Sequence, residues 1–171
     1  MKLNKRYKLH EASSRDIGRY SMQHVSLDDG NLVALDDHIL AVVPVEIEEG
    51  DTDGLIPREA LIDACKAPSK NGGIASIEAN GSIIVRSTPE SMSTYQRPEG
   101  PFPTWRQVVP SSSGFKVAFN PELFARLVKA IGSHDSVTLT FTDGEAPECH
   151  PIHVQGEGEA YGIIMPVRVD R

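Results

Sequence analysis

Gly162-Ile163-Ile164-Met165-Pro166-Val167-Arg168-Val169 is the stretch around which the rest of the chain can be organised. Proline cannot donate a backbone hydrogen bond to a sheet, so a proline inside an apolar strand indicates a sheet edge or a strand end. Taken alone, the stretch fits an ordinary core strand that ends in proline better than anything else. The rest of the chain favours a final strand that leaves its sheet at Pro166 and carries apolar side chains to the surface.

Composition limits the classes of protein. A length of 171 residues favours one domain, or one and a half small modules. The net charge of -7 argues against a protein coated in basic residues for nucleic acid, and leaves room for a local basic lining. Cys65 and Cys149 are too few for a disulfide framework and fit a reducing cytoplasm. No apolar run approaches the roughly 18 residues of a membrane span, and no signal-peptide pattern follows Met1.

Turn residues and hydrophobic periodicity predict two helices among many short strands. The helices are expected over 57–66, where Leu61, Ala64 and Cys65 share a face, and over 120–131, with Asn120 as N-cap. Strands are expected over 5–10, 19–27, 32–35, 39–47, 55–56, 74–78, 82–87, 91–96, 115–119, 136–141, 152–154 and 162–169.

The order strand, helix, three strands occurs twice, from Leu55 and from Phe115. Helices kept apart from antiparallel strands are typical of an α+β protein. The sequence Ser111-Ser112-Ser113-Gly114 looks like a joint between the two copies. We therefore expect an α+β fold built from two related modules.

Several segments resemble the bacterial DNA polymerase III beta sliding clamp family, in the family's order. Arg19-Tyr20-Ser21-Met22 resembles a strand of the middle clamp domain, and the segment 32–41 resembles the family's Ala-Thr-Asp-Gly-His-Arg-Leu-Ala. The segment 102–110 looks like the end of that domain, and 164–169 looks like the clamp's C-terminal Met-Pro-Met-Arg-Leu. The helix from Asn120 is similar to the last clamp helix.

The resemblance implies a DNA-clamp-like fold, with antiparallel sheets and two helices on one side. Residues 1–110 would be a clamp-domain-like module whose first helix is missing, because His10 to Arg19 leaves no room for it. Residues 111–171 would be a half-module of strand, helix and three strands. The two would either form separate lobes or pack as one body.

Clamp helices line a ring around double-stranded DNA and contact phosphates without reading sequence. The candidate DNA-facing residues are Arg58, Lys66, Lys70, Arg126 and Lys129. The alternative is that these residues belong to ordinary solvated helix faces, since Glu59, Asp63 and Glu122 lie among them. The sequence favours this alternative. A chain this short would have to form a homo-oligomer to close a ring.

The resemblance also implies a hydrophobic cleft that captures short linear peptides from DNA polymerases, clamp loaders and repair proteins. Met and aliphatic side chains make an adaptable groove for peptide anchors. Three departures put standard clamp-binding peptides in question: Leu35, Asp37 and Ile39 replace Thr, Gly and Arg of the family pattern. The cleft residues would be Met22, Leu35, Asp37, His38, Ile39, Leu40, Pro110, Ile163, Met165 and Val167.

Other motifs give weaker indications of function. Cys149 and His153 would share a strand face, but a closed structural zinc site needs four ligands, so no metal is expected. The glycine-rich segment 156–162 precedes a strand instead of a helix, so it predicts a hairpin turn and no nucleotide or other cofactor. No catalytic constellation stands out, and we expect no enzyme.

The sequence therefore predicts a cytoplasmic, non-catalytic, clamp-like accessory of DNA replication or repair. It would recruit partners through the peptide cleft and encircle DNA as an oligomer. The alternative is a stand-alone interaction module, or a competitor of a clamp, that does not encircle DNA.

Overall fold

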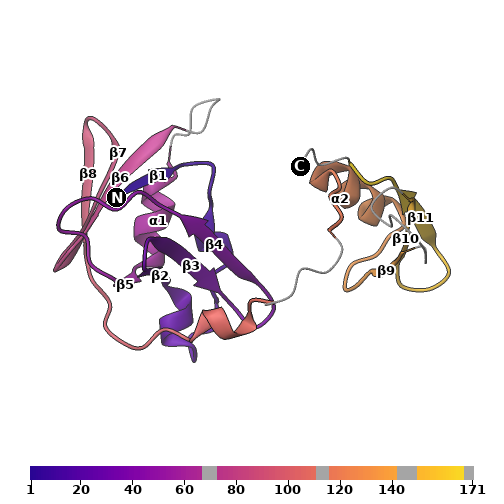
Figure 1. The fold of residues 1–171 in the computed structure, drawn as a ribbon, viewed down its shortest axis with the longest axis horizontal. Coiled ribbons are helices and arrows are strands. Elements are labelled where there is room, and N and C mark those ends of the chain that lie inside the picture. Colours follow the sequence, from indigo (N-terminus) through magenta and orange to yellow (C-terminus); the bar gives the residue numbers. More distant parts are fainter. Residues whose placement is uncertain (67–72, 111–115, 142–149, 168–171) are drawn as a thin grey trace. The chain divides into compact units, whose positions relative to one another are not determined.

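The computed structural model describes residues 1–66, 73–110, 116–141 and 150–167. The chain forms two compact units, Met1–Val109 and Pro110–Arg171, which are treated one at a time (Figure 1). This division lies one residue before the predicted boundary at 110/111. The predicted joint over 111–114 lies outside the described residues. The identity of the two units as a clamp module and a clamp half-module remains a prediction.

The first sheet of the N-terminal unit is antiparallel, with strand order β4-β3-β2-β5. The turn between β2 and β3 uses Asp29 and Gly30, with φ angles of 49° and 73°. Both φ angles are positive, which matches the twist of a tight hairpin and confirms the turn predicted at Asp28-Asp29-Gly30-Asn31. The strands are β2 Val25–Asp28, β3 Asn31–Leu35, β4 Leu40–Pro44 and β5 Gly54–Ile56.

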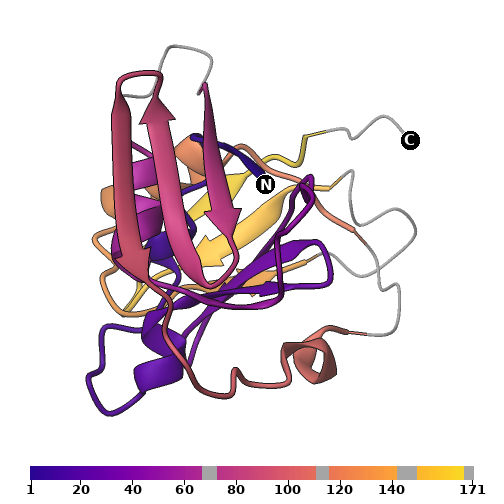
Figure 2. The same ribbon diagram turned by 90° about the vertical axis from the view of Figure 1, so that its left-hand side faces the viewer.

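The second sheet of this unit is also antiparallel, with strand order β1-β6-β7-β8. Figure 2 shows the three long strands of this sheet side by side. Asn80-Gly81 closes the hairpin between β6 and β7, as predicted. The strands are β1 Lys2–Asn4, β6 Ile74–Ala79, β7 Ser82–Thr88 and β8 Ser91–Gln96.

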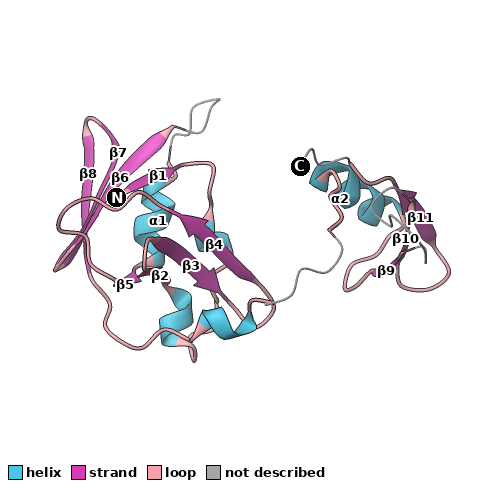
Figure 3. Cartoon of the chain, viewed as in Figure 1, coloured by secondary structure: helices cyan, strands magenta, loops and turns pink. Residues whose placement is uncertain are grey.

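Helix α1, Arg58–Ala64, follows β5 directly and begins after Pro57 (Figure 3). Its inner face consists of Ala60, Leu61 and Ala64, which are fully buried, and Cys65 just beyond the helix is also buried. The helix packs against β6, β7 and β8. The predicted helix and its apolar face are therefore confirmed.

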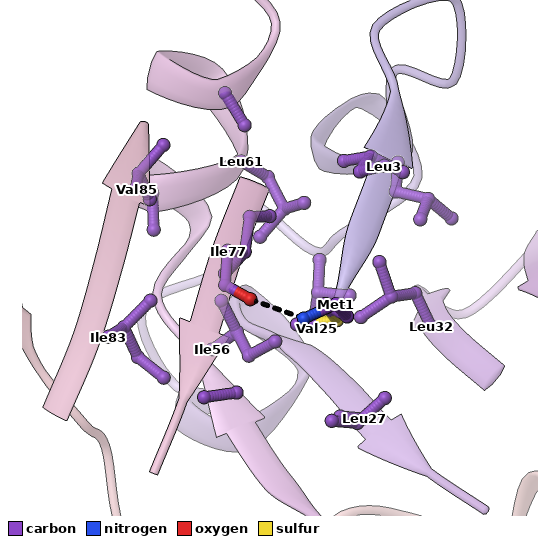
Figure 4. Packing of buried hydrophobic residues seen from close by; sticks show 14 of the residues in the cluster. Met1, Leu3, Val25, Leu27, Leu32, Ile56, Leu61, Ile77, Ile83 and Val85 are labelled. Atoms are coloured by element: carbon purple, nitrogen blue, oxygen red, sulfur yellow. Dashed lines mark hydrogen bonds between the residues drawn. The ribbon is translucent and has the colours of Figure 1, made fainter. Parts of the chain in front are cut away.

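The core of the N-terminal unit is shared by both sheets and α1 (Figure 4). Val25, Leu27 and Leu32 come from one sheet, and Leu3 and Ile77 come from the other, all buried to at least 99%. The backbone nitrogen of Met1 donates to Ile77 O at 2.7 Å, and Ile77 N donates back to Met1 O at 2.9 Å. Because the two sheets bury their apolar faces in one cluster, the unit folds around a single core.

Two strands predicted near the N-terminus are wrong in part. Residues 5–10 contain no strand and instead lead into a 3₁₀ helix, η1 Leu9–Glu11. The segment 19–27 begins as a second 3₁₀ helix, η2 Tyr20–Gln23, before β2 starts. Local bonds explain the difference: Arg6 N donates to Asn4 Oδ1 at 3.0 Å, and Met22 N and Gln23 N both donate to Arg19 O, at 3.0 Å and 3.2 Å. Such local contacts compete with sheet pairing for the backbone.

The C-terminal unit contains helix α2, Pro121–Ala130, and an antiparallel sheet of order β11-β10-β9. Asn120 Oδ1 accepts from Glu122 N at 2.9 Å and from Leu123 N at 3.3 Å, which confirms the predicted N-cap. Gly132, with φ of 69°, follows the helix as its stop. The strands are β9 Thr138–Thr140, β10 Ile152–Gln155 and β11 Tyr161–Ile164.

The strand predicted over 115–119 is not a regular strand within the described residues 116–119, and Phe115 lies outside them. Val167 N nevertheless donates to Ala118 O at 2.7 Å, so the segment runs beside the chain after β11. The final strand is shorter than predicted, because β11 ends at Ile164, two residues before Pro166. The last pair of the ladder joins Ile164 to Ile152, the first residue of β10, and residues 168–169 of the predicted strand lie outside the described residues. Both units share the order of one helix followed by three strands.

The predicted hairpin at 156–162 is confirmed, since β10 and β11 pair on either side of it and Gly156 N donates to Ala160 O at 3.1 Å. The connection after β8 contains a third 3₁₀ helix, η3 Trp105–Val108. Trp105 Nε1 donates to Asp28 Oδ2 at 2.6 Å and anchors this connection to the first sheet. In the described part of the chain, no helix is long and apolar enough to cross a membrane.

A hydrogen bond between Asp63 and Tyr95 connects α1 to β8 and makes the stability of the unit depend on pH. Lys66 bonds to the Asp63 carboxylate, and Tyr95 Oη donates to it at 2.6 Å. Hydrogen bonds from Lys66, then Ser93 and Tyr95, lower the pKa of Asp63 from 3.8 to about 2. Because the folded state holds the ionised form, this contribution is complete above pH 3.8 and is lost as the pH falls toward 2.

We predict that Tyr95→Phe lowers the free energy of unfolding by about 1–2 kcal/mol near neutral pH, because a hydrogen bond to a charged group is lost. The difference from the unchanged protein should shrink as the pH falls from 3.8 to 2, where Asp63 takes up a proton in both proteins. Urea unfolding followed by the fluorescence of Trp105 reports on this unit. Tyr161→Phe, which alters an exposed tyrosine, is the control, and an equal loss in both variants would contradict the prediction.

Candidate functional site

The turn between β3 and β4 presents three predicted cleft residues to solvent. Asp36 Oδ1 accepts from His38 N at 2.7 Å and from Ile39 N at 2.8 Å. These bonds to the ionised form, that from His38 first, lower the pKa of Asp36. The turn is thereby held in a shape that leaves Asp37, His38 and Ile39 exposed, with Ile39 at 51%.

Helix η2 lies beside this turn and contributes the half-buried Met22. Arg19 connects the two elements, because its Nη1 forms an ion pair with Asp37 and lies 3.9 Å from Met22 Sδ. Its Nε lies 3.7 Å from Asp16 Oδ2. Sequence reasoning did not select Arg19 as a site residue, since a pair of residues so far apart in the chain leaves no periodic signal.

Two other predicted residues of this unit have less exposed surface. Leu35 and Leu40 face each other across the ladder, where β3 and β4 pair next to the turn. Leu35 is only 8% exposed and Leu40 is half-buried. They pack at the base of the turn, so the surface open to a ligand consists mainly of Asp37, His38 and Ile39, with the half-buried Met22 beside them.

The C-terminal unit exposes its predicted residues in an alternating row. Ile163, Met165 and Val167 are 51%, 59% and 51% exposed. Their neighbours explain the alternation: Gly162 faces Leu127 of α2 so closely that a Cβ would collide with it, and Ile164 is buried. Tyr161 extends the row and stacks on His153 with ring centroids 4.9 Å apart.

Pro110 is also exposed, at the start of the C-terminal unit. Each unit therefore offers its own exposed apolar side chains. The predicted cleft requires the two sets to converge, and that convergence remains a prediction.

The candidate DNA-facing residues differ in how they are engaged. Arg58 is half-buried, and its Nε donates to His10 O at 2.9 Å. Lys66, two residues beyond the end of α1, pairs with Asp63 of that helix. On α2, Arg126 and Lys129 are exposed, and neither forms an ion pair with another described residue. Lys70 lies outside the described residues.

A cavity of about 430 Å³ on the N-terminal unit was not predicted. It lies between β2, β5 and the proline-rich connection, with the ring of Trp105 on one side and the carboxylates of Asp28 and Asp53 nearby. Arg106 pairs with Asp28 and lies over the Trp105 ring, 4.5 Å from its centroid. Its lining contains none of the predicted cleft residues.

The candidate metal ligands remain untested in part, because Cys149 lies outside the described residues. Within the ranges that the structure describes, no group of three His, Cys, Asp or Glu side chains could hold a metal ion. His153 instead makes the aromatic stack with Tyr161.

Histidine 24 joins η2 to β2 and has no hydrogen-bond partner for either ring nitrogen in the described part of the chain, although both nitrogens are buried. The Tyr20 ring meets His24 edge-on at 4.9 Å. Burial lowers the pKa of His24 from 6.5, against a smaller opposing effect of Glu59. The burial of His10 lowers its pKa in the same way.

Two antiparallel sheets around one helix, followed by a unit that repeats the helix and three strands, define a DNA-clamp-like α+β fold. No family model and no curated protein matches the sequence. Solved structures of bacterial DNA polymerase III beta sliding clamps do match the structure. That of Bacillus subtilis matches at a TM-score of 0.67 and 14% identity, and covers 96% of this chain and 48% of the clamp.

Two further clamps match similarly. The beta subunit of Borrelia burgdorferi, solved in complex with a natural product, gives a TM-score of 0.68 at 15% identity, over 97% of this chain and 47% of that one. The beta chain of Streptococcus pneumoniae gives a TM-score of 0.63 at 21% identity, over 100% of this chain and 49% of that one. This chain thus has the sliding-clamp fold, as the sequence resemblance implied, and spans about half the length of these clamps.

We predict that the N-terminal unit loses stability below neutral pH through the buried His10 and through His24, whose ring nitrogens are buried. The unfolded chain binds the imidazole proton more tightly than the folded unit, so the free energy of unfolding should fall as the pH drops through 6.5. His24→Leu should flatten this dependence between about pH 7 and 5, measured by urea unfolding with Trp105 fluorescence. His38→Leu, at an exposed site, is the control. An unchanged pH profile for His24→Leu would contradict the prediction.

Proposed function

We propose that this protein is a non-catalytic, clamp-like accessory of DNA replication or repair, located in the cytoplasm, that recruits partner proteins by binding short linear peptides. The supporting observation is that four of the exposed large apolar side chains of a clamp fold fall at the positions expected for the cleft: Ile39 in one unit, and Ile163, Met165 and Val167 in the other. Within the C-terminal unit three of these side chains follow one another in a row, and contiguous exposed apolar groups indicate an interaction site.

The chemistry of these side chains suits peptide anchors. Met22 and Met165 have flexible, polarizable thioethers that adapt to different partners, and the aliphatic side chains of Ile39 and Ile163 offer apolar contact area. Peptides from DNA polymerases or clamp-loader-type proteins are the partners that the fold suggests. Such peptides would place short aliphatic and aromatic residues against these groups.

Two roles for DNA are compatible with this proposal. In the first, the chain forms a homo-oligomer around double-stranded DNA, and Arg126 and Lys129 of α2 contact phosphates without reading sequence. In the second, the chain is a stand-alone interaction module or a clamp competitor. The second is favoured by the region of α1, where Arg58 of the helix and Lys66 just beyond it are already engaged within the unit.

A labelled peptide in which glutamine precedes short aliphatic residues and an aromatic residue should bind saturably, as measured by fluorescence anisotropy. Met165→Asp and Ile39→Asp should each weaken binding by about tenfold or more, because each places a charge in an apolar contact. Met92→Asp is the matched control, since Met92 is 65% exposed on β8, outside the proposed site. Equal effects of Met92→Asp and Met165→Asp, with all variants folded, would refute the proposed site.

Duplex DNA provides a separate test of the ring. If α2 faces DNA, the Arg126→Ala, Lys129→Ala double variant should bind duplex DNA more weakly, and its log K against log salt should be less steep by about 2. Lys8→Ala, which removes an exposed cation of the other unit, should have little effect. Protein retained on circular DNA at high salt and released on linearisation would establish a ring. No duplex binding at low salt would leave the stand-alone module.

A further inference from the structure

The exposed apolar groups near the β3–β4 turn are accompanied by an unbalanced cluster of charges. Arg19 lies between two carboxylates, paired with Asp37 and 3.7 Å from Asp16. Arg19 and Asp37 are 45% and 47% exposed, so both are accessible to a ligand while partly shielded from water. Asp36 adds a third carboxylate in the same turn. These four residues carry three carboxylates and one guanidinium; two of the carboxylates pair with Arg19, and that of Asp36 accepts from the backbone of its own turn.

The neighbouring cation does not correct this imbalance. Arg15 pairs with Glu11 at 3.5 Å, so its charge is already matched within its own segment. His38 is exposed on the turn, beside the same carboxylates. The surface that carries Met22 and Ile39 therefore has a local excess of negative charge, in a chain whose net charge is -7.

Charge complementarity then selects among ligands. We propose that Asp37, which forms an ion pair with Arg19 in the free protein, makes this surface prefer peptides that carry a basic residue directly beside their apolar anchors. The inference rests on the proposed peptide-binding function and adds a specificity to it. A ligand ammonium or guanidinium would take over one side of Asp37, while Arg19 keeps its contact with Asp16 and shields Met22 less.

An acidic residue at the same place would meet the opposite situation. It would face Asp16, Asp36 and Asp37 with only one cation to share among them. Like charges across an interface disfavour a partner and slow its approach. The surface thus discriminates through repulsion of acidic peptides as well as attraction of basic ones.

Three labelled peptides test the proposal. They share the apolar sequence used above and differ only in two preceding residues: Lys-Lys, Ser-Ser or Glu-Glu. We expect the Kd to rise in that order, by about two- to fivefold per step at low salt, the range of half-exposed ion pairs. The steps should shrink at about 0.5 M salt, where screening acts over a few ångströms.

Two substitutions should change the preference in opposite directions. Asp37→Asn removes the acceptor and should reduce the advantage of the Lys-Lys peptide over the Ser-Ser peptide. Arg19→Gln removes the internal competitor, frees Asp37, and should increase that advantage. If the ion pair only held η2 against the turn, both variants would weaken all three peptides alike, and the proposal would be wrong.

Failure of this inference can be told apart from failure of the proposed function. Binding of all three peptides with equal Kd would overturn the charge preference and leave the peptide surface in place. No binding of any peptide, the Ser-Ser one included, would overturn both. The salt dependence of the unchanged protein gives a reading even if a variant does not fold, and far-UV circular dichroism identifies that case.

Discussion

Burial of one apolar cluster by two sheets at once is the constraint on which the N-terminal unit depends. Leu27 and Ile56 enter it from one sheet, Ile77 and Ile83 from the other, and Leu61 from α1, all buried to at least 99%. Each such side chain contributes about 1.5–3 kcal/mol relative to exposure. The small Ala60 and Ala64 let α1 approach the strands closely, which explains why a helix of seven residues is stable here.

The same constraint decides what remains at the surface. A strand that buries every second side chain must expose the ones between. On β11 this rule buries Ile164 and presents Tyr161 and Ile163, and the row continues past the strand to Met165 and Val167. At the β3–β4 turn, Asp36 uses its carboxylate to fix the backbone, so its neighbours Asp37 and Ile39 are pushed outward. The candidate binding groups are thus exposed because their neighbours in the chain are buried or hydrogen-bonded to the backbone.

Much of the fold could be predicted because its signals are local. The helix N-cap at Asn120, the Asp29-Gly30 turn and the alternating strand β7 are each specified by residues a few positions apart. The strands predicted over 5–10 and 19–27 failed where local hydrogen bonds took up the backbone, as at Arg6, whose N donates to Asn4 Oδ1, and in the 3₁₀ helix η2. For the site, the exposed Ile39 and Met165 could be predicted from the family resemblance, whereas the burial of Leu35 could not.

By itself, the sequence determined the α+β class, the repeated order of helix and strands, and the apolar row that ends in proline. Those features follow from periodicity and from backbone chemistry within a few residues. Only the tertiary structure decided that Arg19 pairs with Asp37, that Tyr95 bonds to Asp63 and that the ring nitrogens of the half-buried His24 are enclosed with no hydrogen-bond partner among the described residues. These contacts join residues that are distant in the chain. Folding around a core brings such residues together, and no local sequence pattern predicts that they will meet.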